Sequence, residues 1–345
     1  MKWLSDHAVA RLKRAVEEPD LTGTRYRLVE RLGSGGMGTV YLAEDVSLSR
    51  RVALKVLHLP DASGHLAARL LREARVLAQL EHPGIVPVHD VGTLADGRVF
   101  YTMKYVEGPR LDRYLQEAGS TQERLRIFEK TCEAVAFAHA RGVLHRDLKP
   151  ENIMVGPFGE VLVMDWGVAK ILHAPAGEAE TQADTDTGHA GNETEHGMVL
   201  GTPGYMAPEQ ARGELELDAR ADVYALGAIL RYVLTGHAPA EATTLSLAAQ
   251  GESRSARWEK PGHSLPRALA AVCAKAMAPE ANQRYASAEE LAQDVARFRD
   301  GEPVAAYREG ILEKAARVAA RHRTAILLVL AYLVMRVALI FWGHR

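Results

Sequence analysis

The stretch His145-Arg146-Asp147-Leu148-Lys149-Pro150-Glu151-Asn152 combines three kinds of chemistry in one short loop. Asp147 can accept a proton from an attacking hydroxyl group. Asn152 can turn its amide oxygen toward a metal ion, and Lys149 can offset negative charge on a phosphoryl group in transfer. This combination predicts the reactive loop of an enzyme. The alternative is a surface loop that is only charged.

A glycine-rich loop lies upstream, at Gly33-Ser34-Gly35-Gly36-Met37-Gly38. Residues 26–32, 39–43 and 51–57 have the composition of strands, so the loop is expected to join two strands. Glycines allow backbone N–H groups to approach a phosphate closely, since a Cβ would hold the backbone away. A dinucleotide-binding fold places such a loop before a helix, and a P-loop needs a G-x-x-x-x-G-K-[ST] pattern that the sequence lacks.

Lys55 alternates with apolar residues in Val52-Ala53-Leu54-Lys55, which turns it toward a cleft rather than the core. The next apolar pattern, at 66–80, predicts a helix that carries Glu73 beside its buried stripe. A carboxylate on an inward border needs a partner, and Lys55 is the candidate. The alternative is a surface pair between Glu73 and Arg69, four positions apart.

Several segments further along the chain complete the pattern. A break at His82-Pro83-Gly84-Ile85-Val86 begins a strand, and residues 98–106 form the next one. A helix is expected over 122–141, and a hairpin of 153–155 with 161–164 precedes Asp165-Trp166-Gly167. Helices are also expected over 266–277 and 288–299. The segment 201–209 reads G-T-P-G-Y-M-A-P-E.

Together these motifs resemble those of the bacterial Hanks-type serine/threonine protein kinases over about residues 26–300. The resemblance implies an α+β, two-lobed protein-kinase fold. Residues 26–105 would form a small β-rich N-lobe with one key helix, and residues 106–300 a larger, mainly α-helical C-lobe. It also implies transfer of the γ-phosphoryl group of ATP to serine or threonine hydroxyls of proteins, the chain itself included.

The resemblance assigns roles residue by residue. Catalysis would rest on Asp147, Lys149, Lys55 and Glu73. Mg²⁺, with Mn²⁺ as an alternative, would be held by Asn152 and Asp165. ATP would be bound by Gly33, Ser34, Gly35, Gly36, Met37, Gly38, Val40, Lys55, the gatekeeper Met103 and the hinge residues Tyr105 and Val106. The sequence departs from the family at Lys104, where an acidic residue is frequent, and at Trp166, where phenylalanine is usual.

Three further residues would have structural roles. By resemblance, Thr202 braces Asp147 and Lys149, Glu209 forms a buried ion pair with Arg284, and Asp222 accepts backbone N–H groups of the catalytic loop. His139 is expected to be a packed histidine rather than a ligand.

The segment 165–209 would be the activation segment. Its centre, 173–198, carries six acidic residues and no Lys or Arg, which is typical of a mobile loop. We expect phosphorylation at one or more of its threonines, with Arg146 as the partner of the phosphate. The candidates are Thr181, Thr185, Thr187, Thr194 and Thr202. A passive insertion is the alternative.

Composition excludes several classes of protein. The 345 residues are 47% hydrophobic and 25% charged, with a net charge of −2, so nothing global favours nucleic acid as a partner. Cys132 and Cys273 lie in apolar helical patterns and predict neither a disulfide nor a metal site, which fits a reducing compartment. Residues 1–25 form an extension of amphipathic character without the apolar core of a secretory signal.

The C-terminal end predicts a membrane anchor. A basic juxtamembrane helix (301–323, most clearly 310–320) leads to an apolar run at 324–342 whose only charge within 325–342 is Arg336. About 18 residues span ~27 Å, enough for a bilayer core. Arg336 costs ~3 kcal/mol, which about eleven large apolar residues at up to ~0.6 kcal/mol each outweigh. An amphipathic or core helix on the catalytic lobe is the alternative.

The basic residues before this run place the kinase domain in the cytoplasm, with a single pass through the inner membrane. Since only Gly343-His344-Arg345 follow, no external domain is expected in this sequence. Expected partners are protein substrates, ATP and the membrane, with a dimer as one route to phosphorylation in trans. Two other functions remain open: a scaffold of kinase fold without turnover, and a small-molecule phosphotransferase, against which residues 201–209 argue.

Overall fold

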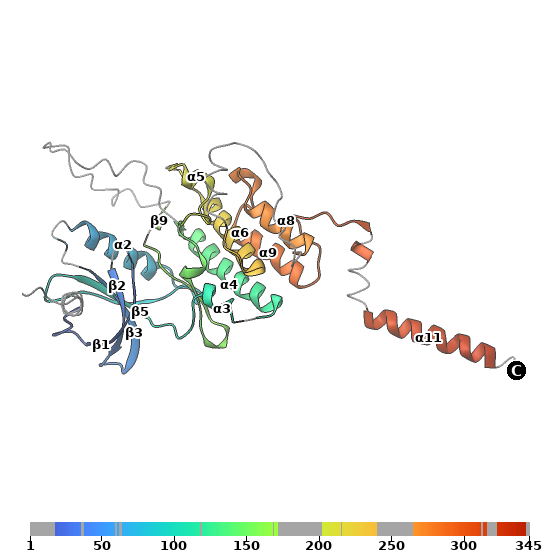
Figure 1. Cartoon of the computed structure of the whole chain (residues 1–345), viewed down its shortest axis with the longest axis horizontal. Helices are drawn as coiled ribbons and strands as arrows, with labels where there is room; N and C mark the ends of the chain where they lie inside the picture. Colours follow the sequence, from blue (N-terminus) through green and yellow to red (C-terminus); the bar gives the residue numbers. More distant parts are fainter. Residues whose placement is uncertain are drawn as a thin grey trace, which may run out of the picture.

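The computed structural model describes residues 18–35, 38–58, 61, 64–117, 119–167, 169–171, 202–214, 216–239, 265–311, 313–315 and 323–342. Figure 1 shows a lobe built on a β-sheet beside a lobe built of helices, with one further helix at the C-terminal end. The predicted two-lobed α+β fold is therefore confirmed. Predicted features within 1–17 and 172–201 lie outside the described residues.

The N-lobe contains a five-stranded antiparallel sheet in the order β1-β2-β3-β5-β4. Its strands are β1 (Tyr26–Ser34), β2 (Gly38–Asp45), β3 (Arg50–Leu57), β4 (Val88–Thr93) and β5 (Val99–Lys104). The first three contain the predicted strands. The predicted start of the fourth strand was wrong: Ile85 forms only an isolated bridge with Val163, and the strand begins at Val88.

The two faces of this sheet pack against different cores. Val52, Leu54 and Val56 of β3 belong to a cluster on one face. Residues that alternate with them, such as Ala53, face the other side and join the main core. Because Lys55 shares the parity of Ala53, its side chain lies on the face toward helix α2 and the C-lobe.

Helix α2 (His65–Gln79) packs against β3, β4 and β5, within one residue of its predicted limits. Its buried positions are Leu70, Glu73, Ala74, Val76 and Leu77. Glu73 is only 2% exposed, so an acidic side chain takes a place in an otherwise apolar stripe.

The C-lobe is organised around α4 (Thr121–Ala140), which packs against α6 (Ala219–Thr235), α9 (Ala288–Arg299) and β8. Helix α8 (Arg267–Ala276) packs against α6 and α9, and two short helices, α3 (Leu111–Tyr114) and α5 (Pro208–Ala211), complete the lobe. Cys132 and Cys273 are buried and free, and burial raises the pKa of the Cys273 thiol to about 12.

Two short two-stranded ladders lie on either side of the loop 145–152. Strand β6 (Val143–Leu144) pairs with β9 (Lys170–Ile171), and β7 (Ile153–Val155) pairs with β8 (Val161–Val163). The loop between β6 and β7 includes the 3-10 turn η1 (Pro150–Asn152), and a second turn, η2 (Pro157–Gly159), joins β7 to β8. Both ends of the loop are therefore tied to regular structure.

The chain beyond α9 stays attached to the C-lobe. The carboxylate of Asp294, itself 1% exposed, accepts the backbone N–H groups of Ala305 and Ala306 at 2.5 and 3.0 Å and the hydroxyl of Tyr285 at 2.8 Å. Val304 is buried beside them. The prediction of a helix from residue 301 was wrong for 301–310, which contain no helix because these bonds hold the backbone against α9.

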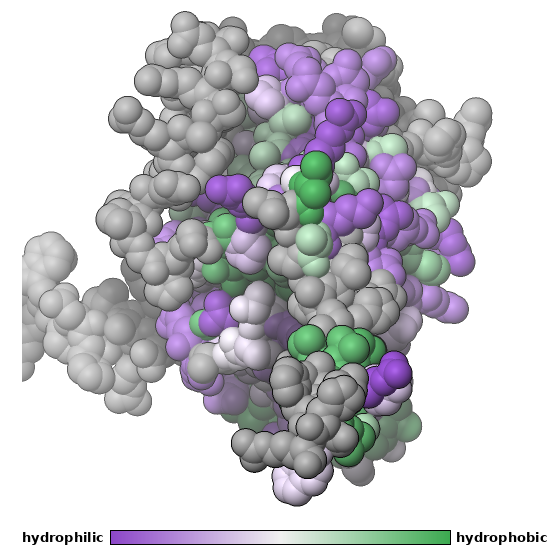
Figure 2. Space-filling view, turned by 90° about the vertical axis from the view of Figure 1, so that its right-hand side faces the viewer, coloured by the Kyte–Doolittle hydropathy of each residue, from purple (hydrophilic) through white to green (hydrophobic). Residues whose placement is uncertain are grey.

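Helix α11 (Arg323–Trp342) follows at the limits expected for the apolar run. It lies away from the C-lobe in Figure 1, and Figure 2, which looks at that end, shows hydrophobic side chains gathered at the lower edge. The exposed apolar side chains of α11 include Leu327, Leu328, Val329, Leu330, Leu333, Val334 and Leu339. Over the part of the chain that the structure describes, no helix combines the length and hydropathy needed to cross a bilayer.

Candidate active site

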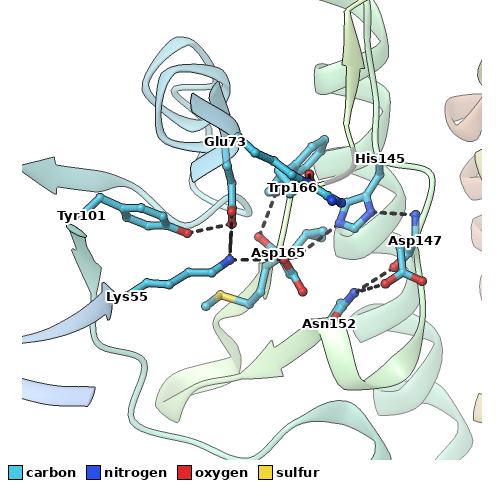
Figure 3. Close-up of polar contacts among 12 residues, drawn as sticks. Lys55, Glu73, Tyr101, His145, Asp147, Asn152, Asp165 and Trp166 are labelled. Carbon is cyan, nitrogen blue, oxygen red and sulfur yellow. Dashed lines mark hydrogen bonds and ion pairs between the residues drawn. The ribbon is translucent and has the colours of Figure 1, made fainter. Parts of the chain in front are cut away.

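Lys55 and Glu73 meet between the sheet and α2, as Figure 3 shows. The ammonium nitrogen of Lys55 lies 2.7 and 2.8 Å from the two carboxylate oxygens of Glu73. Burial disfavours the charged ammonium, but the carboxylates of Glu73 and Asp165 outweigh it, so the pKa of Lys55 lies above its ordinary value. The predicted pair is present. The alternative partner, Arg69, instead directs its Nε toward the carbonyl oxygen of Gly167 at 3.4 Å.

Asp165 lies between this pair and the loop 145–152 in Figure 3. Its Oδ1 is 3.6 Å from the Lys55 ammonium, and its side chain is 49% exposed. Its φ of 58° is left-handed, a conformation that non-glycine residues adopt at a cost of about 1–3 kcal/mol and that is frequent at functional sites. Burial raises the pKa of Asp165, but nearby positive groups, led by Lys55, lower it below the ordinary value.

Trp166 fills an apolar slot behind Asp165. The indole is 1% exposed, packs on the His145 ring at 4.6 Å and donates to the carbonyl of Val163 at 3.4 Å. His145 in turn contacts the carbonyl oxygen of Met164 at 2.9 Å. Tryptophan at the usual phenylalanine position therefore fits, because its ring packs on His145 and its N–H has an acceptor.

Asp222, which is 1% exposed, binds the backbone of the loop 145–152. Its carboxylate accepts the N–H groups of His145 and Arg146 at 2.8 and 2.9 Å, as predicted. His139 Nε2 donates to the same carboxylate at 2.8 Å. Burial works against the ionised carboxyl, but these bonds hold the pKa of Asp222 below its ordinary value.

Asp147, Lys149 and Thr202 form a closed triangle. The ammonium of Lys149 donates to Asp147 Oδ2 at 2.9 Å and to the Thr202 hydroxyl at 2.8 Å. The Thr202 hydroxyl donates to Asp147 Oδ1 at 2.9 Å. The predicted brace by Thr202 is therefore present, and it links the loop to a residue 55 positions further along the chain.

Asn152 is turned so that its amide nitrogen donates to the backbone oxygen of Asp147 at 2.8 Å and to its Oδ2 at 3.3 Å. Since these bonds use the amide nitrogen, the amide oxygen is the atom of this side chain that could bind a cation. Together with the carboxylate of Asp165 this makes a set of hard oxygen donors, which suits Mg²⁺. Among the described residues no group of three His, Cys, Asp or Glu side chains could hold a metal, so phosphate or water oxygens would complete the shell.

The glycine loop is described at Gly33, Ser34, Gly35 and Gly38, while Gly36 and Met37 lie outside the described residues. A Cβ on Gly38 would lie 2.3 Å from the backbone oxygen of Val56, so this glycine is required by the close approach of β2 to β3. A Cβ on Gly35 would meet no atom of the described residues within 4 Å. Val40, on β2, pairs directly with Lys55.

The hinge follows β5. Met103 and Val106 are buried at 6% and 4% exposure and belong to the main core, and Tyr105 between them is half-buried. Lys104, where the family often has an acid, forms an ion pair with Glu160 of the β7–β8 hairpin. The departure at this position therefore links the hinge to the C-lobe.

The end of the activation segment is anchored by Glu209, whose carboxylate oxygens lie 2.6 and 2.7 Å from the guanidinium of Arg284. The pair is buried, and Arg284 also donates to the backbone oxygens of Ala278, Pro279 and Arg220. The predicted ion pair is thus present. Thr181, Thr185, Thr187 and Thr194 lie outside the described residues.

Two polar partners of this site were not predicted. The Tyr101 hydroxyl donates to Glu73 Oε1 at 2.7 Å, and His139 binds Asp222. Tyr101 could have been found from its spacing, because it lies two positions before Met103 and therefore on the same face of the strand. His139 carried no comparable signal, since its partner is 83 positions away.

Taken together, these residues provide a carboxylate (Asp147), a neighbouring ammonium (Lys149), two side chains with oxygen donors for a cation and a paired lysine on the opposite lobe. Such an arrangement can accept a proton while it stabilises negative charge on a transferred group.

Comparison with known proteins identifies relatives. A family model described as "Protein kinase domain" matches residues 26–295. Serine/threonine-protein kinase PknD of Chlamydia trachomatis is 39% identical over 310 residues, covering 81% of this chain and 32% of that protein. PknD of Protochlamydia amoebophila is 36% identical over 298 residues, covering 80% and 30%. The chain thus spans about a third of the length of these curated relatives.

Among solved structures, the kinase domain of Mycobacterium tuberculosis PknI superposes with a TM-score of 0.55 at 28% identity, covering 80% of this chain and 96% of that domain. A second crystal structure of that domain gives a TM-score of 0.52 at 26% identity.

Proposed function

Since this chain belongs to the protein kinase domain family, we propose that it is a serine/threonine protein kinase that transfers the γ-phosphoryl group of ATP to protein hydroxyls. The observation that carries the proposal is the triangle of Asp147, Lys149 and Thr202. It brings a proton acceptor and a cation to one point and holds both in place. The PknD relatives support the serine/threonine branch.

In this reaction the substrate hydroxyl oxygen would bond to the γ-phosphorus while the bond from phosphorus to the β–γ bridging oxygen breaks, leaving ADP. Asp147 would orient the hydroxyl and accept its proton. Lys149 would offset charge on the phosphoryl group. Most of the rate would come from positioning rather than from covalent chemistry.

ATP would lie between the glycine loop and the hinge, with Lys55 bound to its phosphates. Asn152 and Asp165 would hold Mg²⁺, which when bound neutralises charge on the phosphate oxygens. The low pKa of Asp165 supports this role, because an ionised carboxylate is the form that binds a cation.

A scaffold without turnover, the alternative from another class, is disfavoured by the intact set of Lys55, Glu73, Asp147, Asn152 and Asp165. A small-molecule phosphotransferase is disfavoured by the anchored end of the activation segment, where Glu209 pairs with Arg284.

The test is phosphate incorporation by the full chain in detergent with Mg²⁺ and ATP, beside Asp147→Asn. We expect label on Ser or Thr in the parent and a loss of at least about a hundredfold in the variant. Glu151→Gln, an exposed change in the same loop, is the control and should keep activity. An Asp147→Asn protein as active as the parent would contradict the proposal. Bound ATP with no label in either protein would favour the scaffold.

Autophosphorylation of the activation segment is a further part of the proposal. Arg146 supports it: its side chain is half-buried, burial lowers its pKa, and its Nε has no hydrogen-bond partner among the described residues. A phosphate would supply that partner. Phosphosite mapping of fully active protein should find a modified threonine among Thr181, Thr185, Thr187 and Thr194, since the Thr202 hydroxyl is bonded to Asp147 and Lys149. An unmodified segment would count against the proposal.

We also propose that α11 anchors the chain to the cytoplasmic membrane, with the kinase domain on the cytoplasmic face. Its support is the exposure of large apolar side chains along the described part of α11, for example Leu328 at 67% and Val334 at 69%. Water-exposed surface of this kind is costly unless lipid or protein covers it.

A further inference from the structure

Tyr101 is placed beside Lys55 by the register of the sheet. Strands β3 and β5 are antiparallel, and Lys55 pairs directly with Tyr101. Directly opposed residues project from the same face of a sheet. Both side chains therefore point toward α2, where Glu73 is buried, and Figure 3 shows the three converging.

Tyr101 contacts both members of the pair. Its hydroxyl donates to Glu73 Oε1 at 2.7 Å, and the Lys55 ammonium lies 5.8 Å from the centre of its ring. The residue is 2% exposed, and the Glu73 side chain is 0% exposed. Water therefore cannot replace either donor to this carboxylate, and each donor that is lost leaves a buried acceptor short of a partner.

The two donors differ in what else they can bind. Lys55 is a flexible cation that the proposed reaction requires at the phosphates of ATP, so its bond to Glu73 must be shared. Tyr101 is held in the core, and among the described residues its hydroxyl bonds only to Glu73. Burial and the nearby Glu73 carboxylate raise the pKa of Tyr101 well above its ordinary value, so its hydroxyl remains a donor at working pH.

We propose that Tyr101 is a positioning residue: an uncharged second tether that holds Glu73, and with it α2, against the sheet whether or not Lys55 is bonded to Glu73. The position of α2 would then not depend on Lys55 or on nucleotide. This inference goes beyond the proposed function, and only its kinetic test rests on that function.

The first test measures amide hydrogen exchange of α2 in the full chain in detergent without nucleotide. The proteins are the parent, Tyr101→Phe, Lys55→Met and the double variant. Helix α4 serves as the internal reference for folding. We expect Lys55→Met alone to change exchange in α2 by less than about threefold, and the double variant to exchange at least about tenfold faster than Lys55→Met, since a hydrogen bond to a charged group is lost.

The matched control is Tyr26→Phe. Tyr26 is also buried in the N-lobe, and its hydroxyl donates to the Asp90 carboxylate at 2.8 Å, but it belongs to the cluster on the other face of the sheet. Tyr26→Phe combined with Lys55→Met should leave exchange in α2 as it is in Lys55→Met alone. If Lys55→Met by itself frees α2 as fully as the double variant does, Tyr101 is no independent tether and the proposal is overturned.

The second test is kinetic. Tyr101→Phe should raise KM for ATP by about three- to tenfold with a smaller change in kcat, because Lys55 is then the remaining donor to Glu73 and must divide its N–H groups between Glu73 and the phosphates. Tyr26→Phe should not. A KM for ATP equal to that of the parent would overturn this role. Absence of activity in the parent would instead contradict the proposed function and leave the exchange test intact.

Discussion

Thr202 connects two reactive side chains through one hydroxyl, which accepts from Lys149 and donates to Asp147. Thr202→Val keeps the shape and removes both bonds. We expect kcat to fall by about ten- to a hundredfold with little change in KM for ATP, because only the reacting end of the cleft is disturbed. Steady-state kinetics check this. Thr202→Ser, which keeps the hydroxyl, should retain most activity, and equal loss in both variants would contradict the role.

Asp222 binds the backbone of the loop 145–152, and its contribution to stability is expected to depend on pH. Asp222→Asn replaces one accepting oxygen by an amide group that cannot accept N–H donors, so we expect the free energy of unfolding to fall by about 2–4 kcal/mol at pH 7. Because the pKa of Asp222 in the folded state is depressed, its contribution is present above the unfolded value of about 3.9 and is lost as the pH falls through the lower folded value.

The gap between parent and Asp222→Asn should therefore narrow below about pH 4, which urea unfolding at several pH values can measure. Asp218→Asn is the control. Asp218 caps the same helix by accepting from the N–H of Arg220 at 2.8 Å, and asparagine caps a helix about as well. A gap that stays constant down to pH 3 would contradict the assignment.

At the scale of the element, two glycines of the glycine loop have different roles: Gly38 allows β2 to pack on β3, and Gly35 is expected to contact ATP. Gly38→Ala would place a Cβ 2.3 Å from the Val56 oxygen, so we expect the free energy of unfolding to fall by about 2 kcal/mol as β2 is pushed from β3. Gly35→Ala meets none of the described residues and should change stability by less than about 0.5 kcal/mol while it raises KM for ATP. Thermal unfolding and kinetics of both variants test this contrast, and equal destabilisation would contradict it.

The elements themselves followed the sequence closely where a periodic pattern extended over several turns. Helices α2 and α4 lie within one residue of their predicted limits, since a long apolar stripe can be buried in only one way. The strand placed at Ile85 was wrong because the apolar run there packs between the lobes, and regular pairing with β5 starts only at Val88.

At the scale of the whole molecule, α11 distinguishes the chain from its kinase domain. In flotation with lipid vesicles, the full chain should rise with the vesicles, and a chain without residues 323–345 should stay in the aqueous fraction. The matched control is Leu330→Asp with Val334→Asp, which keeps the length and places two charges on the exposed apolar surface of α11. Both positions are exposed in α11. A shortened chain that still floats would contradict the anchor.

The segment between α9 and residue 313 is attached to the C-lobe, which shortens the link to α11. Asp294 binds the backbone at residues 305 and 306, and Glu313 accepts the hydroxyl of Tyr307 at 2.9 and 3.0 Å. Among the described residues, the contact of Glu313 with Arg267 of α8 lies ten positions before α11 begins. At most ~35 Å of extended chain separates the two, which would keep the active site near the anchor.

The sequence by itself determined the catalytic loop, the lysine of β3, its glutamate partner and the two-lobed fold. Residues that act within one loop have their relative positions set by spacing along the chain, so Asp147, Lys149 and Asn152 could be assigned together. Only the tertiary structure revealed the bond from Tyr101 to Glu73, the bond from His139 to Asp222 and the close approach of β2 to β3 that requires glycine at position 38. Those contacts join residues 28 and 83 positions apart, or depend on how closely two strands approach, and so follow from strand register and helix packing rather than local pattern.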